Sequence, residues 1–186
     1  NCLKVTTEDK ERYIVKYYFK KEGIFNAIKS EADNLLFLNT HKFNFFPKII
    51  NSNDEFLIMS FIDNNNFQPN KTNGDLLDAI ISLHSKKSNN YGLSFDTQIG
   101  GLKQSNSNSK NWVEFYREKR LNYIFDLINK NHPMDKAINT KIELLLKKLD
   151  NFIPNKPKPS LLHGDLWDGN ILFKNKKFSG FIDPGS

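Results

Sequence analysis

Two acids and one amide near the end of the sequence have the residue types and the spacing that phosphoryl transfer requires. Asp165 and Asn170 stand five positions apart in the run HGDLWDGN, and Asp183 follows two further apolar runs. A carboxylate can orient an attacking hydroxyl and accept its proton, while carboxylate and amide oxygens are hard ligands of the kind that Mg²⁺ prefers. The pattern therefore favours Asp165 as a catalytic base and Asn170 as a metal ligand.

A β-hairpin is expected to bring Asp183 to the same place. Residues 171–173 and 178–182 are short apolar runs separated by the polar sequence KNKK. If the two strands pair around Lys176 and Lys177, Asn170 and Asp183 lie directly opposite each other. Directly opposed side chains have Cβ atoms about 5 Å apart, which suits one or two metal ions. Asp183 is therefore predicted as a second metal ligand.

Lys16 and Glu31 could supply the positive charge that the phosphates of ATP require. Lys16 interrupts an apolar strand, an unusual place for a lysine unless it lies at an edge or has a partner. Glu31 follows in the next helix, and a Lys–Glu pair that reaches into a cleft can hold the α- and β-phosphates. The alternative is that strand alternation turns Lys16 to solvent and that Glu31 is one of several acids on a helix surface.

The elements expected to position these residues form two lobes joined by a linker. Within residues 1–62 the apolar residues form short runs typical of strands, with one segment of helical spacing between them. Within residues 75–186 they recur mainly at helical spacing. Residues 63–74 are polar and rich in Asn, with Pro and Gly, and predict the linker. The predicted class is α+β, with a small sheet-plus-helix lobe over residues 1–62 and a larger helical lobe over residues 75–186. The predicted strands are residues 12–19, 47–50 and 55–62, the predicted helices are residues 24–38, 75–86, 112–129 and 136–149, and residues 91–109 are expected to form a loop.

Composition narrows the classes of function. The 186 residues, 38% of them hydrophobic and including 16 Phe, can build a core for one domain or two small lobes. No apolar run approaches the roughly 20 residues that cross a bilayer, and the polar, charged opening residues do not lead us to expect a signal peptide. One cysteine excludes an internal disulfide and fits the cytoplasm. Lys and Arg are spread along the chain despite a net charge of +6, so neither nucleic acid nor membrane is expected as a partner.

The run HGDLWDGNILF, with FIDPGS after it, resembles the kinase superfamily that contains aminoglycoside phosphotransferases, choline kinases and fructosamine (ketosamine) kinases. The Trp in this run, and DPG in place of the DFG of protein kinases, are most similar to the fructosamine kinases. The segments VKYYF, SEADNLLFL, LIMSFID, YGL, GG and NWVEFYR fit the same family, so the resemblance covers nearly the whole chain. It implies a bilobal protein-kinase-like fold with a catalytic hairpin.

The resemblance also implies an activity and a set of roles. The expected reaction is ATP- and Mg²⁺-dependent phosphorylation of a hydroxyl, the sugar O3, of a small-molecule or protein-bound ketosamine such as fructosamine or ribulosamine, which would be a protein-deglycation activity. Carried over by position, the roles are Asp165 as catalytic base, Asn170 and Asp183 as Mg²⁺ ligands, Lys16 and Glu31 at the ATP phosphates, the backbone of Met59, Ser60 and Phe61 at adenine, and Trp167 and Asp168 at the substrate.

Several alternatives remain open at this point. The acceptor could instead be an aminoglycoside, choline or another amino alcohol, or the chain could be a pseudokinase without activity. Trp167 could plug the core of a loop instead of meeting substrate. The glycine-rich nucleotide loop is expected before Asn1 and a further helical region after Ser186, so both ends are expected to be incomplete. Cys2 falls after the expected loop and receives no redox role, and the oligomeric state is open.

Overall fold

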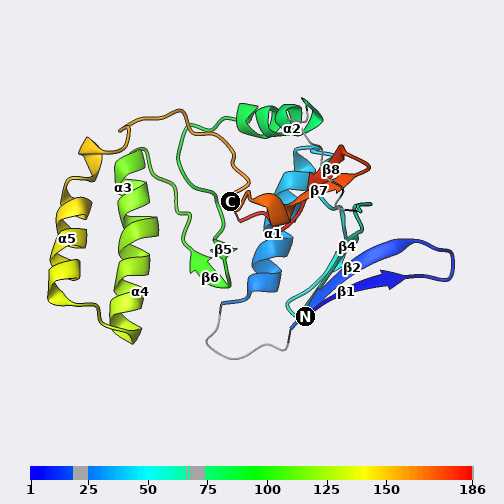
Figure 1. Cartoon of the computed structure of the whole chain (residues 1–186), viewed down its shortest axis with the longest axis horizontal. Coiled ribbons are helices and arrows are strands. Elements are labelled where there is room, and N and C mark those ends of the chain that lie inside the picture. Colours follow the sequence, from blue (N-terminus) through cyan, green and yellow to red (C-terminus); the bar gives the residue numbers. More distant parts are fainter. Residues whose placement is uncertain (19–24, 66, 68–73, 186) are drawn as a thin grey trace. The chain divides into compact units, whose positions relative to one another are not determined.

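The computed structural model describes residues 1–18, 25–65, 67 and 74–185, and it mixes helices with small antiparallel sheets (Figure 1). Its contacts divide the chain into two compact units. The sheet unit comprises residues 1–86, 97–103 and 160–186, and the helical unit comprises residues 87–96 and 104–159. The α+β class is as predicted. The predicted lobe boundaries around residues 63–74 stay a prediction, and residues 66 and 68–73 of that linker lie outside the described residues.

A four-stranded antiparallel sheet forms one face of the sheet unit. Its strands are β1 (Cys2–Thr6), β2 (Arg12–Tyr17), β3 (Ile49–Ser52) and β4 (Phe56–Ser60), in the spatial order β1-β2-β4-β3. The predicted strands correspond to β2, β3 and β4, although residue 19 lies outside the described part. Because β2 pairs on both sides, Lys16 is not on an edge strand, and its ammonium therefore needs a partner.

Helix α1 (Ala27–Thr40) packs against β3 and β4. Its start is set by Asn26, whose side chain accepts a hydrogen bond of 2.9 Å from the Lys29 N–H. Such a cap satisfies one of the N–H groups that a helix leaves unpaired at its first turn. The predicted helix 24–38 is confirmed from Ala27 on: the helix begins after Asn26, later than predicted, and extends to Thr40. Its apolar face enters a core formed by Ala32, Leu35, Leu38, Phe46, Leu57, Met59, Ala79, Leu83, Leu161 and Phe181.

The predicted hairpin is present as β7 (Ile171–Lys174) and β8 (Lys177–Phe181), but its predicted register is wrong. The turn consists of Asn175 and Lys176, whose φ angles of 51° and 67° are both positive. Two such residues form the mirror-image type of turn whose twist matches that of paired strands, and Asn tolerates this conformation well. The turn is therefore centred one residue earlier than expected.

The corrected register changes which residues face each other at the open end of the hairpin. Ile171 pairs with Phe181, after a register shift between Leu172 and Phe173. Beyond this pair, the Ile182 N–H donates to the Asn170 carbonyl at 3.1 Å. Asn170 thus faces Ile182. Asp183 lies one residue beyond the position opposite Asn170, where the sequence analysis had placed it.

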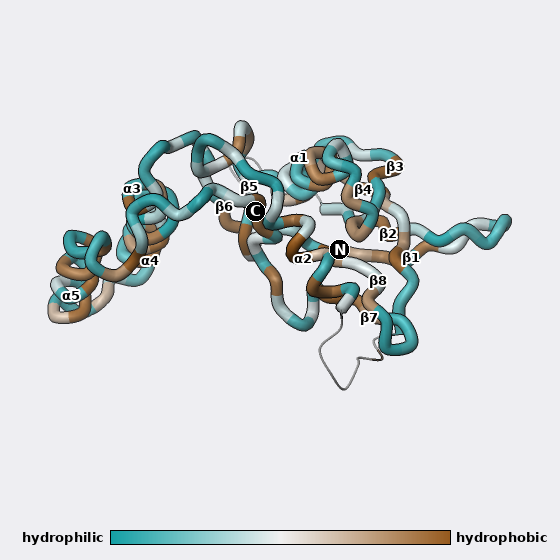
Figure 2. Tube along the Cα trace, turned by 90° about the horizontal axis from the view of Figure 1, so that it is seen from above, coloured by the Kyte–Doolittle hydropathy of each residue, from teal (hydrophilic) through white to brown (hydrophobic). Residues whose placement is uncertain are grey.

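The remaining helices confirm the predicted helical segments with two differences. Helix α2 (Gly74–Ser85) belongs to the sheet unit, and the helical unit contains α3 (Trp112–Tyr116), a π-helical stretch (Arg117–Asn122), α4 (Tyr123–Asn131), α5 (Lys136–Lys147) and a short 3₁₀ turn (Leu149–Asn151). The expected helix 112–129 is thus interrupted by wider turns. The expected loop 91–109 contains two short strands, β5 (Thr97–Ile99) and β6 (Leu102–Gln104). Apolar residues recur along α3, α4 and α5 (Figure 2).

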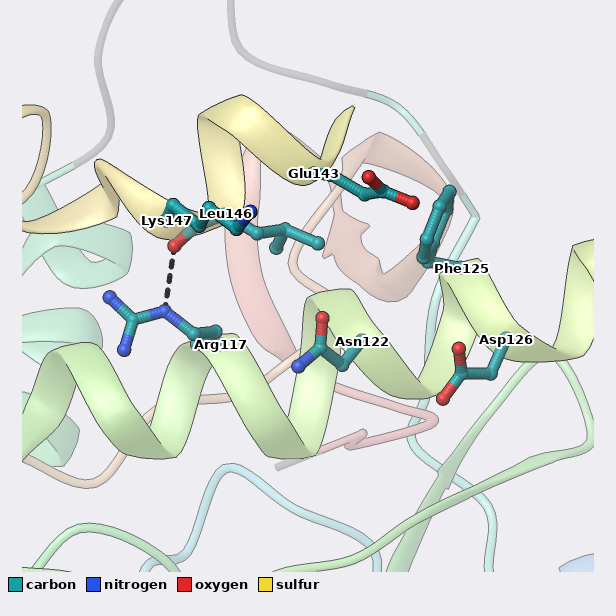
Figure 3. Close-up of a pocket in the computed structure, with 7 residues that line it drawn as sticks. All are labelled: Arg117, Asn122, Phe125, Asp126, Glu143, Leu146 and Lys147. Carbon is teal, nitrogen blue, oxygen red and sulfur yellow. Dashed lines mark hydrogen bonds between the residues drawn. The ribbon is translucent and has the colours of Figure 1, made fainter. Parts of the chain in front are cut away.

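A shallow groove of about 540 Å³ runs along the helical unit between its π-helical stretch, α4 and α5 (Figure 3). The Arg117 Nε donates to the Leu146 carbonyl at 2.7 Å and ties the two sides together. None of the predicted site residues lines this groove. The groove is lined by Arg117, Asn122, Phe125, Asp126, Glu143, Leu146 and Lys147.

Among the described residues, no helix has both the length and the apolar character needed to cross a bilayer.

Candidate functional site

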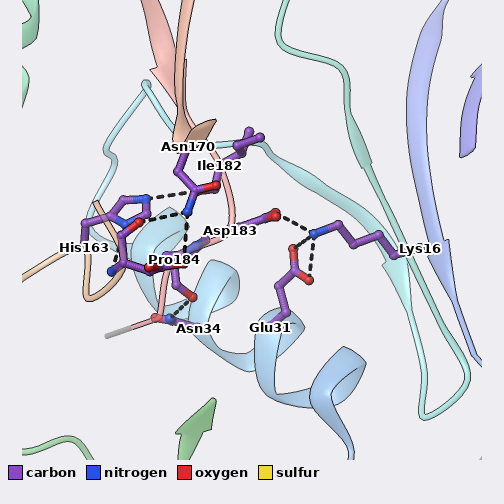
Figure 4. A network of polar contacts seen from close by, with 9 residues as sticks. Lys16, Glu31, Asn34, His163, Asn170, Ile182, Asp183 and Pro184 are labelled. Carbon is purple, nitrogen blue, oxygen red and sulfur yellow. Dashed lines mark hydrogen bonds and ion pairs between the residues drawn. The ribbon is translucent and has the colours of Figure 1, made fainter. Parts of the chain in front are cut away.

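Lys16 lies between two carboxylates from different elements of the sheet unit (Figure 4). Its Nζ donates to both oxygens of Glu31, at 2.8 and 3.0 Å, and to Oδ1 of Asp183 at 2.5 Å. Only 16% of the Lys16 side chain and 7% of the Glu31 side chain are exposed, compared with 45% for Asp183. The predicted Lys16–Glu31 pair is therefore formed, and the alternative in which Lys16 points to solvent is wrong.

Burial and charge act against each other within this group. Burial disfavours the ammonium form, but the neighbouring carboxylates of Glu31 and Asp183 outweigh it and raise the pKa of Lys16. For Glu31, burial raises the pKa of the carboxyl even though Lys16 opposes it. Lys16 consequently keeps its charge at neutral pH, where it can face a phosphate.

Asp165 and Asn170 are joined directly. A short 3₁₀ turn (Asp168–Asn170) ends at Asn170 and brings its side chain back over the loop. The Asn170 Nδ2 donates to the Asp165 carbonyl at 2.8 Å and to the Asp165 carboxylate Oδ2 at 3.1 Å. Both bonds use the nitrogen end of the amide, so the oxygen Oδ1 is the end that can reach a cation.

His163 is a member of the site to which the sequence analysis gave no role. Its ring is 1% exposed, and its Nε2 lies 3.0 Å from the Ile182 carbonyl. The Asp165 N–H donates to Nδ1 at 3.3 Å, so the ring proton belongs on Nε2, where it can be donated to Ile182. Burial lowers the pKa of His163, although the Ile182 carbonyl and Asp165 oppose this. A neutral His163 thus joins the loop of Asp165 to Ile182, the residue between β8 and Asp183.

The two chain segments that carry the acids approach each other closely. The Gly185 N–H donates to the His163 carbonyl at 2.8 Å. A Cβ added at Gly185 would lie 3.3 Å from the Asp165 Cβ, so a larger residue there would press on the predicted base. Asp183 itself has a φ of 53°, which is uncommon outside glycine. This conformation has to be held in place by its surroundings.

The residues at this site fit Mg²⁺. The magnesium ion commonly binds one or two carboxylates together with substrate phosphates and water, and does not require a cage made only of protein groups. A half-exposed carboxylate on Asp183 and an amide oxygen on Asn170 are such donors. In the described part of the chain, no cluster of three or more His, Cys, Asp or Glu side chains forms a metal site of another kind.

The predicted adenine contact is only partly compatible with the structure. Met59 is 3% exposed and belongs to the core. The Ser60 N–H donates to the Lys48 carbonyl at 2.8 Å, and the Phe61 N–H donates to the Arg12 carbonyl at 3.2 Å. These two N–H groups are therefore engaged within the protein, and adenine would have to be recognised by other backbone groups of the segment.

Trp167 and Asp168 lie on the surface beside Asp165. The Trp167 side chain is 61% exposed, so the alternative in which it plugs the core is wrong. Its ring covers Gly169, where an added Cβ would lie 2.4 Å from the ring carbon Cη2. Gly169 thus leaves room for the indole. Asp168 is exposed as well, and the substrate contact of both residues stays a prediction.

Comparison with known proteins decides the family. The family model described as fructosamine kinase matches residues 1–186. The chain belongs to the fructosamine kinase family. It is 34% identical over 169 residues to a chloroplastic protein-ribulosamine 3-kinase of Arabidopsis thaliana, an alignment that covers 89% of this chain and 50% of that protein. This member of the fructosamine kinase family therefore spans about half the length of that relative.

Solved structures show which fold the fructosamine kinase chain adopts. An inferred fructosamine-3-kinase from Thermobifida fusca YX-ER1 superposes with a TM-score of 0.82 at 23% identity, covering 99% of this chain and 64% of that one. A ternary complex of the aminoglycoside phosphotransferase APH(2")-IIa with streptomycin and ATP superposes with a TM-score of 0.57 at 20% identity, covering 98% and 64%. The predicted protein-kinase-like fold is confirmed.

Proposed function

We propose that the protein transfers the γ-phosphoryl group of ATP to a hydroxyl of a ketosamine. The observation that carries this proposal is the hydrogen bond from Asn170 to the carboxylate of Asp165. In the same sheet unit, Lys16 donates a hydrogen bond to the carboxylate of Asp183. A base candidate, two oxygen donors for a cation and a buried ammonium are the groups that phosphoryl transfer needs from a protein. A pseudokinase is the weaker reading, because none of these groups is missing.

The proposed roles follow from how each side chain is held. Asn170 donates to Oδ2 of the Asp165 carboxylate. The other oxygen of Asp165, Oδ1, is then left to orient the acceptor hydroxyl. The hydroxyl gives its proton to Asp165 as its oxygen bonds to phosphorus, and the bond between phosphorus and the departing ADP breaks. Bound Mg²⁺, held by Asn170 and Asp183, would neutralise phosphate charge. Lys16 would turn from Asp183 toward the phosphates while Glu31 keeps it in place.

The acceptor class comes from the family. Ketosamines are sugar-adducted amines, and phosphorylation at the sugar O3 would make the adduct decompose and free the amine. Trp167 offers an exposed aromatic face of the kind on which sugars pack, and Asp168 offers a carboxylate beside it for a cationic amine. A reducing compartment such as the cytoplasm is the location we propose, because Cys2 is an exposed free thiol.

The acceptor is tested by measuring ADP release from MgATP by the full-length protein. Ribulosyl-lysine and fructosyl-lysine are offered beside choline and kanamycin. Turnover confined to the ketosamines is the expected result. Turnover confined to choline or kanamycin would keep the phosphoryl-transfer site and reject the ketosamine, whereas ATP binding without turnover on any acceptor would favour a pseudokinase.

The base is tested with Asp165→Asn. We expect turnover to fall by about a hundredfold or more, because the amide cannot take a proton from the acceptor. The melting temperature should change little, since an amide can keep the contact with Asn170. Asp135→Asn is the matched control, because Asp135 is exposed in the helical unit and its side chain makes no cap. Turnover like that of the wild type in Asp165→Asn would reject the assignment.

A further inference from the structure

Asn34 is a buried polar side chain of α1 that the proposed mechanism does not use. It is 1% exposed and lies on the inner face of the helix, which also carries the buried residues Glu31 and Leu35. Its Nδ2 donates to the carbonyl of Pro184 at 2.9 Å, across 150 positions of sequence (Figure 4). Burying an amide is costly unless it forms hydrogen bonds, so the position calls for an explanation beyond packing.

The place of Asn34 on the helix connects two parts of the site. Residues three apart on an α-helix lie on the same face, so Asn34 and Glu31 project to the same side of α1. Glu31 holds Lys16, and Asn34 holds the residue that follows Asp183. One rigid helix thus contacts both the phosphate-facing cation and the backbone beside the metal-ligand candidate.

The segment around Asp183 needs such a contact. Asp183 has a positive φ of 53°, which costs energy in a residue other than glycine, and conformations of this kind persist when their surroundings over-determine them. His163 holds the carbonyl of Ile182 on one side, and its own carbonyl holds the N–H of Gly185 on the other. Pro184 has no N–H, so its carbonyl is the backbone hydrogen-bonding group by which that residue can be fixed. Asn34 supplies the donor.

We propose that Asn34 is a positioning residue that fixes the conformation of Asp183 for Mg²⁺ binding and couples it to α1. The inference rests on the proposed role of Asp183 as a metal ligand. A role in packing alone would make Asn34 matter for stability without affecting metal-dependent nucleotide binding. The two roles are separable because ADP can be titrated with and without the metal.

The test is a calorimetric titration of the full-length protein with ADP, in the presence of Mg²⁺ and in the presence of a chelator. Asn34→Leu keeps the branch at Cγ, at a larger volume, and removes the donor. We expect the gain in ADP affinity on adding Mg²⁺ to shrink by about tenfold, the equivalent of one hydrogen bond, with metal-free ADP affinity nearly unchanged. Asn34→Ala serves as a second variant if the leucine is not accommodated, because alanine favours the helix.

Leu38→Val is the matched control. Leu38 is fully buried on the same helix, and its truncation should lower the melting temperature without changing the Mg²⁺-dependent gain. An Asn34 variant that keeps the full gain would reject the positioning role. A wild-type protein that binds ADP equally well with and without Mg²⁺ would instead reject the metal site itself, and the role of Asn34 with it.

Discussion

Lys16 keeps two carboxylates close together that would otherwise repel each other. Glu31 is almost entirely buried, whereas Asp183 is half-exposed, so the two depend on Lys16 to different degrees. Removing one partner of a buried ion pair is costly because it leaves an uncompensated charge in a poorly solvated place. The ion group therefore makes a pH-dependent prediction that does not require any substrate.

Lys16→Met should destabilise the protein by about 3 kcal/mol near neutral pH, where Glu31 is left charged and buried. Burial already raises the pKa of Glu31 above its ordinary value of 4.5, and the loss of Lys16 raises it further. In the variant, folding thus favours the protonated carboxyl of Glu31. Stability is therefore lost as the pH rises from the ordinary pKa of this carboxyl through its higher pKa in the folded state. Urea unfolding at about pH 5 should therefore show a smaller deficit than unfolding at about pH 7.5.

Glu31→Gln provides the comparison for this prediction. It removes the buried carboxylate and leaves Lys16 bound to Asp183, so its effect on the free energy of unfolding should be smaller at neutral pH. The loss of stability in Glu31→Gln should also not become smaller toward acid pH, in contrast to that in Lys16→Met. An equal deficit for Lys16→Met at both pH values would mean that Glu31 is not the charge that the lysine compensates.

At the scale of elements, strand β8 is anchored to the loop between α1 and β3. The Phe181 N–H donates to the carbonyl of Phe45 at 2.8 Å. A Cβ added at the neighbouring Gly180 would lie 2.7 Å from that same oxygen and 2.8 Å from Cδ1 of Ile62. Glycine at position 180 therefore allows the hairpin to lie against Phe45 and Ile62, and Asp183 follows directly after the hairpin.

Gly180→Ala should destabilise the protein by about 1–3 kcal/mol, because the added methyl group forces the Phe45 carbonyl away and weakens its bond to Phe181. Turnover should fall as well, since Asp183 follows two residues after Phe181. Thermal unfolding and ADP release measure the two effects. Gly74→Ala is the control, because nothing lies within 4 Å of a Cβ added there. A Gly180 variant as stable as this control would show that the close approach is not required.

The hairpin also shows how far the sequence could predict the site. Apolar runs predicted both strands, but the register depended on the turn, and the ability of Asn175 and Lys176 to take positive φ decided it. The Lys16–Glu31 pair was predictable because a lysine inside an apolar strand needs a partner. The link from Asn34 to Pro184 was not, because it joins residues 150 positions apart, although an Asn among the buried residues of α1 is a visible signal.

At the scale of the whole molecule, the predicted site residues gather in one of the two compact units. Lys16, Glu31, Asp165, Asn170 and Asp183 all belong to the sheet unit, although the chain leaves that unit twice between them. The helical unit contains the π-helical stretch and the groove beside α5, and none of these five residues. The predicted contacts to the nucleotide can therefore be tested as a property of the sheet unit, with the helical unit as an internal reference.

We expect MgADP to slow amide hydrogen exchange mainly in the sheet unit. A ligand that binds the folded state stabilises the parts of the structure that hold it, and exchange reports local as well as global opening. Protection should appear in β2, in α1 and in residues 161–185, where the predicted phosphate and metal contacts lie. Residues 112–147 should change little, because none of these contacts falls there. Exchange measured by mass spectrometry on the full-length protein gives both regions in one experiment.

The control for this prediction is the variant Asp183→Asn in the same exchange experiment. The amide removes one negative ligand for the cation, so the part of the protection that depends on Mg²⁺ should decrease while any protection by ADP alone persists. Because both regions are measured in the same sample, a general change in stability would alter exchange in residues 112–147 as well. Equal protection of the helical segments and of α1 would place the nucleotide elsewhere and overturn the assignment of the phosphate contacts to Lys16 and Asp183.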